Sequence, residues 1–419
     1  MKALKIQGGK ELKGTIRISG AKNSSVALIP AAILADDVVT ICNVPEITDI
    51  DALSDILEYL KADVKRASES IVIDPKTSIN RPIPTNMAQK LRASYYFMGA
   101  LLGKYKHVEM SFPGGCSIGA RPINLHLKGF EALGAKITQN DNVYIVDAEE
   151  LKGANIYLDI ASVGATINIM LAAVKAKGTT IIDNAAKEPE IVNVATFLNN
   201  MGARITGAGT SEIRIKGVDK LNGCFHEVIP DRIEAGTYMI IAALAGNNVK
   251  IDNIIPEHLE ALTSKLAEIG VPIEMGMDYV IIKKPQSYKP VNIKTLVFPG
   301  FPTDLQQPFS VLLTQCNGKS TIEETIYENR FMHVPELEKM GANIKVSGTK
   351  ATVYGPTKLS GSTVTATDLR AGAAMVCAAL IAESGEETII TNAEHILRGY
   401  EDIVEKLSEV GAKIRIKEI

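Results

Sequence analysis

Apolar residues recur along this chain in two kinds of helical pattern. One kind is amphipathic: Leu53, Leu57 and Leu60 share one helix face, and charged residues alternate with them. The other kind is apolar at nearly every position, which is typical of a helix with no face toward solvent. We predict six helices of this second kind, at residues 25–34, 93–102, 165–174, 235–244, 305–313 and 371–381.

A short phrase follows the amphipathic pattern at six places. In its commonest form it reads apolar residue, Gly, Ala, any residue, Ile, as at residues 133–137. Its second residue lies at 61, 134, 202, 270, 341 and 411, so the gaps are 73, 68, 68, 71 and 70 residues. Glycine suits the left-handed residue that ends a helix, and a strand pattern follows at once. Six units of about 70 residues therefore account for the 419 residues.

Each unit is predicted to run strand, buried helix, strand, amphipathic helix and hairpin. Short strands flank the buried helix, for example at residues 14–19 and 178–182. This alternation indicates an α/β fold. A single hydrophobic core stops growing near about 250–300 residues, so we expect two domains of three units each.

The composition excludes several classes of partner. The chain has 45 Lys and Arg against 48 Asp and Glu, a formal net charge of −3, which gives no electrostatic footprint for nucleic acid. Aromatic residues make up 5% and Trp is absent, so base-stacking platforms are not expected. The long charge-free apolar stretch at residues 235–249 is shorter than the roughly 18 residues of a membrane span. We therefore expect neither a nucleic-acid nor a membrane partner.

Cysteine and histidine usage points to a cytoplasmic protein without a metal. The first 20 residues are polar and strand-like, unlike a signal peptide. Five cysteines without a CxxC pair favour a reducing compartment and argue against disulfides and zinc. The six histidines form no HxH or HExxH motif, and no GxGxxG or P-loop motif is present. No cofactor is expected.

Polar residues gather where the predicted buried helices start. They are Lys22, Asn23, Arg92, Ser162, Arg232, Asp304, Asp368 and Arg370. Helix capping is an equal alternative for Ser162, Asp304 and Asp368. Capping does not explain the cations, because a positive charge in the first turn opposes the helix dipole. The pattern favours helix N-termini that meet at one cleft and bind an anion such as phosphate or carboxylate.

Cys116 stands in a segment with three glycines and two prolines, residues 112–122, which predicts a surface loop. Arg121 lies five residues further on and would lower the pKa of the thiol. A catalytic acid or nucleophile is favoured, although an incidental exposed cysteine remains the alternative. Arg330 stands at a predicted strand-to-helix turn and is either structural or ligand-facing.

These motifs resemble the UDP-N-acetylglucosamine 1-carboxyvinyltransferases, the enolpyruvyl transferases that begin peptidoglycan precursor synthesis. The matching segments span the chain in family order: SGAKNSS (19–25), LRAS (91–94), FPGGCSIGARPI (112–123), SVGAT (162–166), AAKEPEIV (185–192), PDRIEAGT (230–237), FPTDLQQPF (301–309), ENRFMHVPEL (328–337), ATDLRAG (366–372) and HILRGYE (395–401). The resemblance implies a two-domain inside-out α/β barrel with six copies of a β-α-β-α-β-β unit. It sets the domains at 22–229 and at 1–21 with 230–419, and the active site in the cleft between them.

The resemblance also implies a reaction. Phosphoenolpyruvate and UDP-N-acetylglucosamine would give the enolpyruvyl ether and phosphate by addition and then elimination. Cys116 would protonate the phosphoenolpyruvate methylene and could form a covalent adduct with it. Asp304 would be the base near the sugar 3-hydroxyl. Phosphoenolpyruvate is then a co-substrate, and the oligomeric state stays open.

The resemblance assigns binding roles to most of the polar residues above. Phosphoenolpyruvate would be held by Lys22, Arg121 and Arg398, and Arg92 and Arg370 would line the same cleft. Lys22 and Arg398 would count as catalytic residues beside Cys116 and Asp304. UDP-N-acetylglucosamine would be contacted by Asn23, Arg121, Pro122, Ile123, Asn124, Leu125, Ser162, Val163, Gly164 and Ile326. Arg232, Arg330 and Asp368 are further candidate substrate-binding residues.

Three positions depart from the family pattern. Asn124 stands where many members carry Asp, Ile160 where some carry Lys, and Tyr96 where some carry Trp. They bear on nucleotide affinity rather than on reaction type. Two alternatives stay open: the sister enolpyruvyl transferase that acts on shikimate 3-phosphate, and a two-lobed anion-binding protein without chemistry. The sister enzymes lack the cysteine loop, so PGGC at 113–116 discriminates.

Overall fold

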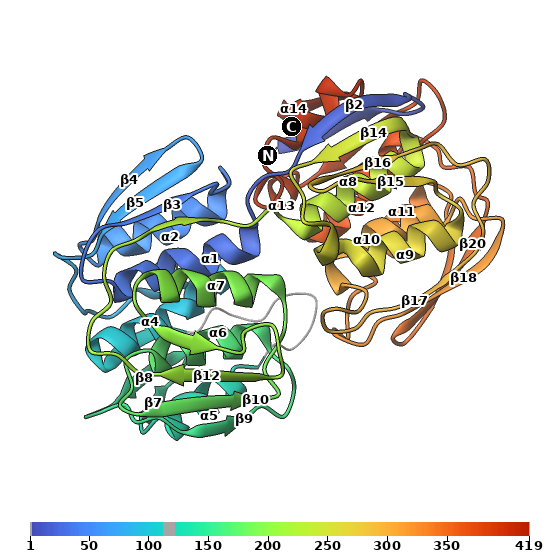
Figure 1. Cartoon of the computed structure of the whole chain (residues 1–419). Coiled ribbons are helices and arrows are strands. Elements are labelled where there is room, and N and C mark those ends of the chain that lie inside the picture. The colour runs from blue at the N-terminus through green and yellow to red at the C-terminus, as the bar shows by residue number, and fades with distance from the viewer. Residues whose placement is uncertain (1, 112–121, 419) are drawn as a thin grey trace. The chain divides into compact units, whose positions relative to one another are not determined.

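The structure is a computed structural model that describes residues 2–111 and 122–418 (Figure 1). The contacts divide these residues into two compact units. The central unit comprises residues 20–111 and 122–229, and the terminal unit comprises residues 2–19 and 230–418. Each unit has its own hydrophobic core. The cleft between two domains stays a prediction.

All six predicted buried helices are present. In the central unit they are α1 (Lys22–Ala31), α4 (Tyr96–Tyr105) and α6 (Val163–Ala173). In the terminal unit they are α8 (Arg232–Ala245), α10 (Thr303–Leu313) and α12 (Leu369–Leu380). Helix α4 packs on both α1 and α6, and the three helices of the terminal unit pack on one another. Their side chains are buried nearly all round, as the apolar pattern requires.

The amphipathic helices lie between these cores and the surface. They are α2 (Thr48–Tyr59), α5 (Asn124–Ala132), α7 (Pro189–Asn200), α9 (Glu260–Ile269), α11 (Val334–Lys339) and α14 (Ile403–Glu409). The second residue of the repeated phrase has a positive φ at all six places, from 69° at Lys61 to 104° at Gly202. The phrase therefore ends each helix in the left-handed conformation and turns the chain into a strand.

Within residues 2–111 and 122–418 the strands form six small sheets with one recurring pattern. In each four-stranded sheet a central strand pairs in parallel with one edge strand and antiparallel with one strand of an antiparallel pair. The sheets of the central unit, in spatial order, are β13 (Phe225–Glu227), β3 (Val39–Cys42), β5 (Ser70–Asp74), β4 (Asp63–Ala67); β6 (His107–Ser111), β8 (Val143–Asp147), β7 (Lys136–Asn140); and β9 (Asn155–Tyr157), β10 (Thr179–Asp183), β12 (Glu212–Lys216), β11 (Arg204–Thr206).

The terminal unit repeats the same pattern. Its sheets are β2 (Leu12–Arg17), β14 (Gly246–Asp252), β16 (Tyr279–Ile282), β15 (Ile273–Met275); β17 (Asn292–Lys294), β18 (Gly318–Glu323), β20 (Lys350–Gly355), β19 (Asn343–Ser347); and β21 (Thr363–Thr365), β22 (Glu387–Thr391), β1 (Lys2–Gln7), β23 (Lys413–Glu418). Short helices α3 (Thr85–Ala88) and α13 (Glu394–Leu397) lie outside the repeat.

Strand pairing closes each unit through segments that are far apart in sequence. Strand β2 precedes the first buried helix along the chain, yet it pairs with β14 in the terminal unit (Figure 1). Strand β13 takes the corresponding place beside β3 in the central unit. Strand β1 lies between β22 and β23, so the N-terminal strand completes the last hairpin. These three sheets thus satisfy their backbone groups with strands that the repeat pattern alone does not pair.

Candidate active site

Charged residues stand at the start of all three buried helices of the terminal unit. Arg232 is the first residue of α8, and Asp304 and Arg370 are the second residues of α10 and α12. The sequence pattern predicted these positions, and the structure separates them into two environments.

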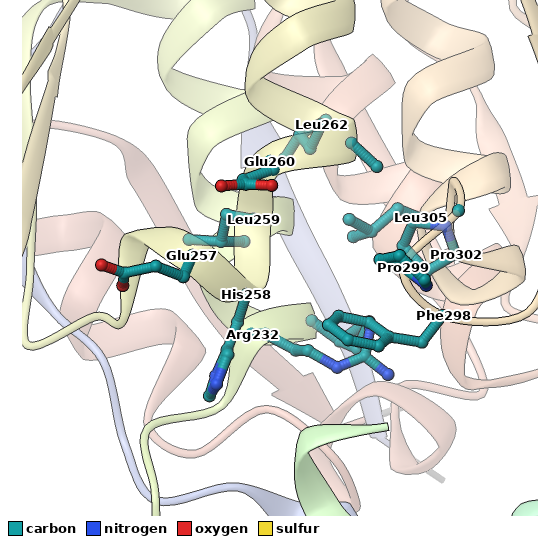
Figure 2. Close-up of a pocket in the computed structure, with 13 residues that line it drawn as sticks. Arg232, Glu257, His258, Leu259, Glu260, Leu262, Phe298, Pro299, Pro302 and Leu305 are labelled. Atoms are coloured by element: carbon teal, nitrogen blue, oxygen red, sulfur yellow. The ribbon is translucent and has the colours of Figure 1, made fainter. Parts of the chain in front are cut away.

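Arg232 lies at a small hollow of the terminal unit (Figure 2). Its guanidinium carbon is 5.4 Å from the centre of the Phe298 ring, and Glu257, His258 and Pro299 also line the hollow. The cavity volume is about 10 Å³, which is about the space of one water-sized sphere. The enclosed part of the hollow within this unit is therefore water-sized.

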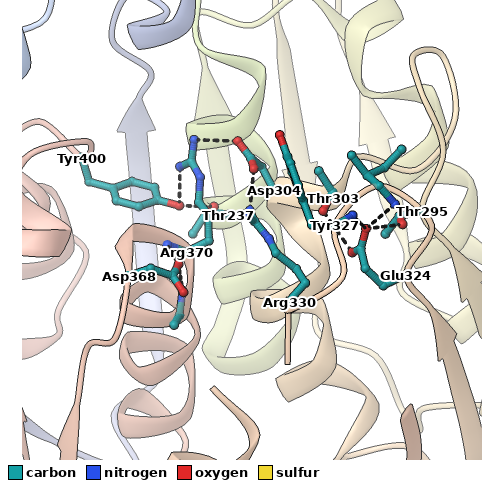
Figure 3. A network of polar contacts seen from close by, with 12 residues as sticks. Thr237, Thr295, Thr303, Asp304, Glu324, Tyr327, Arg330, Asp368, Arg370 and Tyr400 are labelled. Carbon is teal, nitrogen blue, oxygen red and sulfur yellow. Dashed lines mark hydrogen bonds and ion pairs between the residues drawn. The ribbon is translucent and has the colours of Figure 1, made fainter. Parts of the chain in front are cut away.

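Asp304 and Arg370 meet at a network of polar contacts (Figure 3). The Asp304 carboxylate accepts a hydrogen bond from Nη2 of Arg330 at 2.6 Å and another from Nη2 of Arg370 at 3.2 Å. Side-chain exposure is 4% for Arg330, 6% for Arg370 and 28% for Asp304. The carboxylate is thus the accessible member of a largely buried ionic cluster. Charge-assisted bonds of this kind fix the orientation of a carboxylate.

Capping explains some helix starts but not Asp304. The Asp368 carboxylate accepts from the backbone N–H groups of Arg370 at 2.9 Å and Ala371 at 3.0 Å, so it caps α12. Asp231 caps α8 in the same way. Asp304 lies inside the first turn of α10 and directs its carboxylate to arginines instead. Capping is therefore confirmed at Asp368 and does not apply to Asp304, while anion binding at these helix starts stays a prediction.

Glu324 is a buried carboxylate that the sequence analysis missed. It accepts hydrogen bonds from the hydroxyl groups of Thr295 at 2.8 Å and Thr303 at 3.0 Å, and from the backbone N–H of Ile326 at 2.9 Å. It therefore joins the turn that carries Ile326 to the residue before Asp304. A carboxylate directly after strand β18 looks like an ordinary surface residue in the sequence, and only its burial reveals this role.

Arg398 follows helix α13 and is partly buried. Two residues later Tyr400 is fully buried, with its hydroxyl oxygen 3.0 Å from Nη1 of Arg370. The turn that carries Arg398 is thus attached to the cluster around Asp304.

In the central unit, Lys22 is the first residue of α1 and forms an ion pair with Asp49. Nζ of Lys22 lies 2.8 Å from Oδ2 of Asp49, and the two side chains are 13% and 5% exposed. Asn23 follows in the same turn and is partly buried. Asp49 was not predicted, because an acid in the first turn of an amphipathic helix resembles a simple complement to the helix dipole.

Arg92, residues 122–125 and residues 162–164 come together around His126. Arg92 opens a short 3-10 helix, and His126 follows the first residues of α5. Burial lowers the pKa of His126 to about 3, and the charge of Arg92 adds to this shift. A Cβ atom at Gly164 would lie 2.7 Å from the Tyr95 hydroxyl and 3.0 Å from Cε1 of His126. Two segments with predicted nucleotide contacts and the segment of Arg92, which is predicted to face phosphoenolpyruvate, therefore pack closely in one unit.

The remaining predicted residues of this group differ in exposure. Ser162 caps α6 by accepting from the backbone N–H of Ala165 at 3.2 Å, and Val163 is partly buried. The group at the start of α5 divides into exposed Pro122 and Asn124, partly buried Leu125 and buried Ile123. Of the other departures from the family pattern, Ile160 is 69% exposed and Tyr96 is 4% exposed.

Cys116 and Arg121 lie outside the described residues. The four described cysteines are Cys42, Cys224, Cys316 and Cys377. Burial raises the pKa of all four thiols, to about 11 at Cys224 and about 12 at Cys316. These four are therefore protonated at neutral pH and unsuited to act as nucleophiles.

The described residues also bear on metal binding and on membrane crossing. No group of three or more His, Cys, Asp or Glu side chains in residues 2–111 and 122–418 could hold a metal ion. Among the helices of those residues, none is long and apolar enough to cross a membrane.

Comparisons with known proteins agree on one family. A family model described as EPSP synthase (3-phosphoshikimate 1-carboxyvinyltransferase) matches residues 6–407. A protein of Geobacillus kaustophilus named UDP-N-acetylglucosamine 1-carboxyvinyltransferase 2 is 57% identical over 99% of this chain and 96% of its own length. A protein of the same name from Listeria monocytogenes is 56% identical over 98% of this chain and 96% of its own length.

Two solved structures share the fold. The crystal structure of an enolpyruvyl transferase from Streptomyces tendae has a TM-score of 0.91 and 27% identity, and the match covers 99% of each chain. An EPSP synthase from Acinetobacter baumannii has a TM-score of 0.77 and 18% identity over 100% of each chain. The predicted two-domain α/β fold with six repeats is confirmed.

Proposed function

The chain belongs to the EPSP synthase family of enolpyruvyl transferases, and from this premise we propose the reaction that it catalyses. It transfers the enolpyruvyl group of phosphoenolpyruvate to the 3-hydroxyl of UDP-N-acetylglucosamine and releases phosphate. One observation carries this choice of acceptor: relatives of that name are 56–57% identical over nearly the whole chain. The EPSP synthase reaction is less supported, since the solved structure with that name is only 18% identical.

The proposed chemistry has two steps. In the addition, the sugar oxygen bonds to C2 of phosphoenolpyruvate while C3 gains a proton. In the elimination, C3 loses a proton, the bond from C2 to the phosphate oxygen breaks, and phosphate leaves. An acid and a base held in place each contribute roughly 10²–10⁴-fold to the rate of such steps.

We assign the base to Asp304. Its carboxylate is oriented by Arg330 and Arg370 and is more exposed than either arginine. Because this carboxylate is 28% exposed, a hydroxyl group of a bound substrate can reach it. The assigned role is to take the proton of the sugar 3-hydroxyl as that oxygen attacks.

Cations at or near helix ends suit an anionic co-substrate. Arg370 and Arg398 belong to the terminal unit, and Lys22 and Arg92 to the central unit. Together with Arg121, they are the proposed ligands of the phosphate and carboxylate groups of phosphoenolpyruvate. Fixed cations stabilise such charge without any proton transfer.

The proposed nucleotide-sugar ligands lie mainly in the central unit. They are Asn23, Pro122, Ile123, Asn124, Leu125, Ser162, Val163 and Gly164, with Ile326 from the terminal unit. The close packing at Gly164 supports this grouping, because it joins the segment 162–164 to His126, directly after residues 122–125. Arg232 and Asp368 are weaker proposals, since one lines a small hollow and the other caps a helix.

The acid is assigned to Cys116. Chemistry supports this choice, because burial raises the pKa of the other four thiols. The proposed place of the reaction is the cytoplasm, at the start of peptidoglycan precursor synthesis, and hence in cell wall biogenesis, cell shape and cell division.

One assay tests the proposed function. Phosphate release from phosphoenolpyruvate is measured with UDP-N-acetylglucosamine, with shikimate 3-phosphate and with no acceptor. Release only with UDP-N-acetylglucosamine is the expected result. Release only with shikimate 3-phosphate would reassign the acceptor, and binding of phosphoenolpyruvate without release in any mixture would favour a binding protein.

A further inference from the structure

We propose that Tyr400 is a positioning residue of the transfer reaction, whose hydroxyl group holds the guanidinium of Arg370 against the carboxylate of Asp304. This inference rests on the proposed function for the roles of Arg370 and Asp304. Tyr400 is 1% exposed, so it acts through Arg370 rather than on a substrate.

The hydrogen-bond order around Tyr400 follows from counting donors. Its hydroxyl oxygen lies 2.9 Å from Oγ1 of Thr237 and 3.0 Å from Nη1 of Arg370 (Figure 3). The single hydroxyl hydrogen of Thr237 is donated to the carbonyl oxygen of Ile233 at 2.9 Å. Thr237 can therefore only accept from Tyr400. Arg370 cannot accept the hydrogen of Tyr400, because a guanidinium only donates, so that hydrogen goes to Thr237. The Tyr400 oxygen is thereby left to accept from Arg370.

Arg370 is held at both ends of its guanidinium. Nη1 donates to Tyr400 and Nη2 donates to Asp304, while the buried Nε has no hydrogen-bond partner among the described residues. The side chain is 6% exposed. Without the tyrosine hydroxyl, one of two anchoring bonds is lost, and the guanidinium can turn away from Asp304. Removing one partner of a buried polar group costs more than an average hydrogen bond contributes.

The same tyrosine joins three elements that carry proposed site residues. Thr237 lies on α8, Arg370 on α12 and Asp304 on α10. Tyr400 itself stands two residues after Arg398, and the next residue, Glu401, accepts a hydrogen bond from the hydroxyl of Ser19. The backbone around Arg398 is therefore anchored independently of the Tyr400 hydroxyl. We expect loss of that hydroxyl to affect Arg370 most.

The deciding variant is Tyr400→Phe, which removes one oxygen and keeps the buried ring. We expect kcat/KM for phosphoenolpyruvate to fall by about 10–100-fold, the range for losing a bond to a charged group. KM for UDP-N-acetylglucosamine should stay within about twofold. The cluster contains the proposed base and a proposed ligand of phosphoenolpyruvate, whereas the proposed nucleotide-sugar ligands lie mainly in the other unit. A merely structural tyrosine would instead change the kinetic constants for both substrates alike.

Tyr238 offers a matched control. It is the neighbour of Thr237 on α8, its side chain is fully buried, and its hydroxyl has no hydrogen-bond partner among the described residues. Tyr238→Phe removes the same atom without breaking a bond, so its kinetics should match the wild type. A kcat/KM for Tyr400→Phe within about twofold of that of Tyr238→Phe would overturn the proposal.

A second variant tests the hydrogen-bond order. Thr237→Val takes away the acceptor of the tyrosine hydrogen and leaves Tyr400 intact. We expect a loss of the same kind, and a double variant with Tyr400→Phe that is no worse than the poorer single variant. Strictly multiplicative losses would contradict a shared chain of hydrogen bonds.

A binding measurement separates this inference from the proposed function. The rise in thermal midpoint that phosphoenolpyruvate causes is measured for wild type, Tyr400→Phe and Tyr238→Phe. If the wild type binds phosphoenolpyruvate but never releases phosphate, the proposed function fails, and a smaller rise for Tyr400→Phe alone still supports the positioning role. An equal rise for all three proteins, or none for any, counts against Tyr400.

Discussion

The acidic residues at helix starts differ in what their carboxylates contact. Asp368 and Asp231 accept from backbone N–H groups of the first turn, whereas Asp304 accepts from two arginine side chains. The first arrangement stabilises a helix by about 1 kcal/mol. The second holds a carboxylate in a defined direction at a partly exposed position, which suits a base.

Asp304→Asn should bind UDP-N-acetylglucosamine but lose turnover by about 10²-fold or more. The amide keeps the size of the side chain and one oxygen acceptor, but it has no basic carboxylate. Phosphate release gives the rate, and calorimetric titration with the nucleotide sugar gives the binding. Wild-type turnover in this variant would remove Asp304 as the base.

Cys116 should be the one cysteine that the epoxide antibiotic fosfomycin alkylates. The four described thiols have raised pKa values and stay protonated at neutral pH, so they react slowly. Mass spectrometry of the intact protein and of its peptides should find a single adduct on Cys116. Cys116→Ser should stay unmodified, and an adduct on any other cysteine would contradict the assignment.

His333 should make the terminal unit less stable in acid. The ring is 1% exposed, its Nε2 lies 2.9 Å from Oγ of Ser310, and burial lowers its pKa from 6.5 to about 3. Below pH 6.5 the unfolded chain binds a proton that the folded state excludes. The folded state is therefore destabilised as pH falls, by about 1.4 kcal/mol per pH unit down to about pH 3.

Urea unfolding at pH 7.0 and pH 5.5 measures this dependence. His333→Asn removes one titrating group, so its stability should change less between the two pH values than that of the wild type. The comparison uses the difference between pH values, because the substitution also changes stability by itself. Equal differences for both proteins would show that His333 does not titrate as described.

At the scale of elements, helix ends repeat one backbone conformation with two kinds of residue. Lys61 has a φ of 69°, and the five corresponding glycines have φ values from 95° to 104°. A side chain in the left-handed region costs roughly 1–2 kcal/mol. The sequence phrase therefore marks a helix end even where glycine is replaced.

Lys61→Gly should stabilise the central unit by up to about 1 kcal/mol, part of the gain being offset by the greater freedom of glycine in the unfolded chain. Gly202→Ala is the reverse test. A Cβ atom there meets only Nδ2 of Asn222, at 3.5 Å, so the cost comes from the backbone and should be about 1 kcal/mol. Denaturant unfolding checks both, and a stabilised Gly202→Ala variant would contradict the argument.

At the scale of the whole molecule, segments from both ends of the chain share the terminal unit. Strand β1 pairs with β23. Ser19, shortly after strand β2, forms a cluster with Glu234 and Lys406. Nζ of Lys406 lies 2.7 Å from Oε1 of Glu234, and the side chains are 15% and 4% exposed. The chain thus closes the unit with an ion pair as well as with strands.

Lys406→Met should destabilise the terminal unit by about 3 kcal/mol at pH 8 and by less at pH 6. Burial raises the pKa of Glu234 to about 7, and loss of the lysine raises it further. Without the lysine, the Glu234 carboxyl group is neutral at pH 6. At pH 8 it must either stay charged without a partner or take up a proton against the pH. The loss of stability therefore grows as pH rises. Adding Glu234→Gln should recover much of the stability at pH 8. A loss that is independent of pH would argue against an isolated carboxylate.

Much of the fold could be predicted from the sequence, because burial and backbone conformation leave local patterns. The six apolar helices, the amphipathic helices and the left-handed residues that end them were predicted from spacing and composition. The resemblance supplied roles for Asp304, Arg370 and Arg398. Asp49, Glu324 and Tyr400 were not predicted, since a buried partner of a charged residue looks like any other acid or aromatic residue in sequence.

The number, kind and order of the repeated elements follow from the sequence alone, because each of these depends on neighbours within a few turns of chain. Long-range packing sets the rest: β13 pairs with β3, β1 pairs with β23, and Asp304 meets two arginines while Asp368 caps a helix. Those choices depend on which distant backbone groups and charges can satisfy one another once the cores have formed.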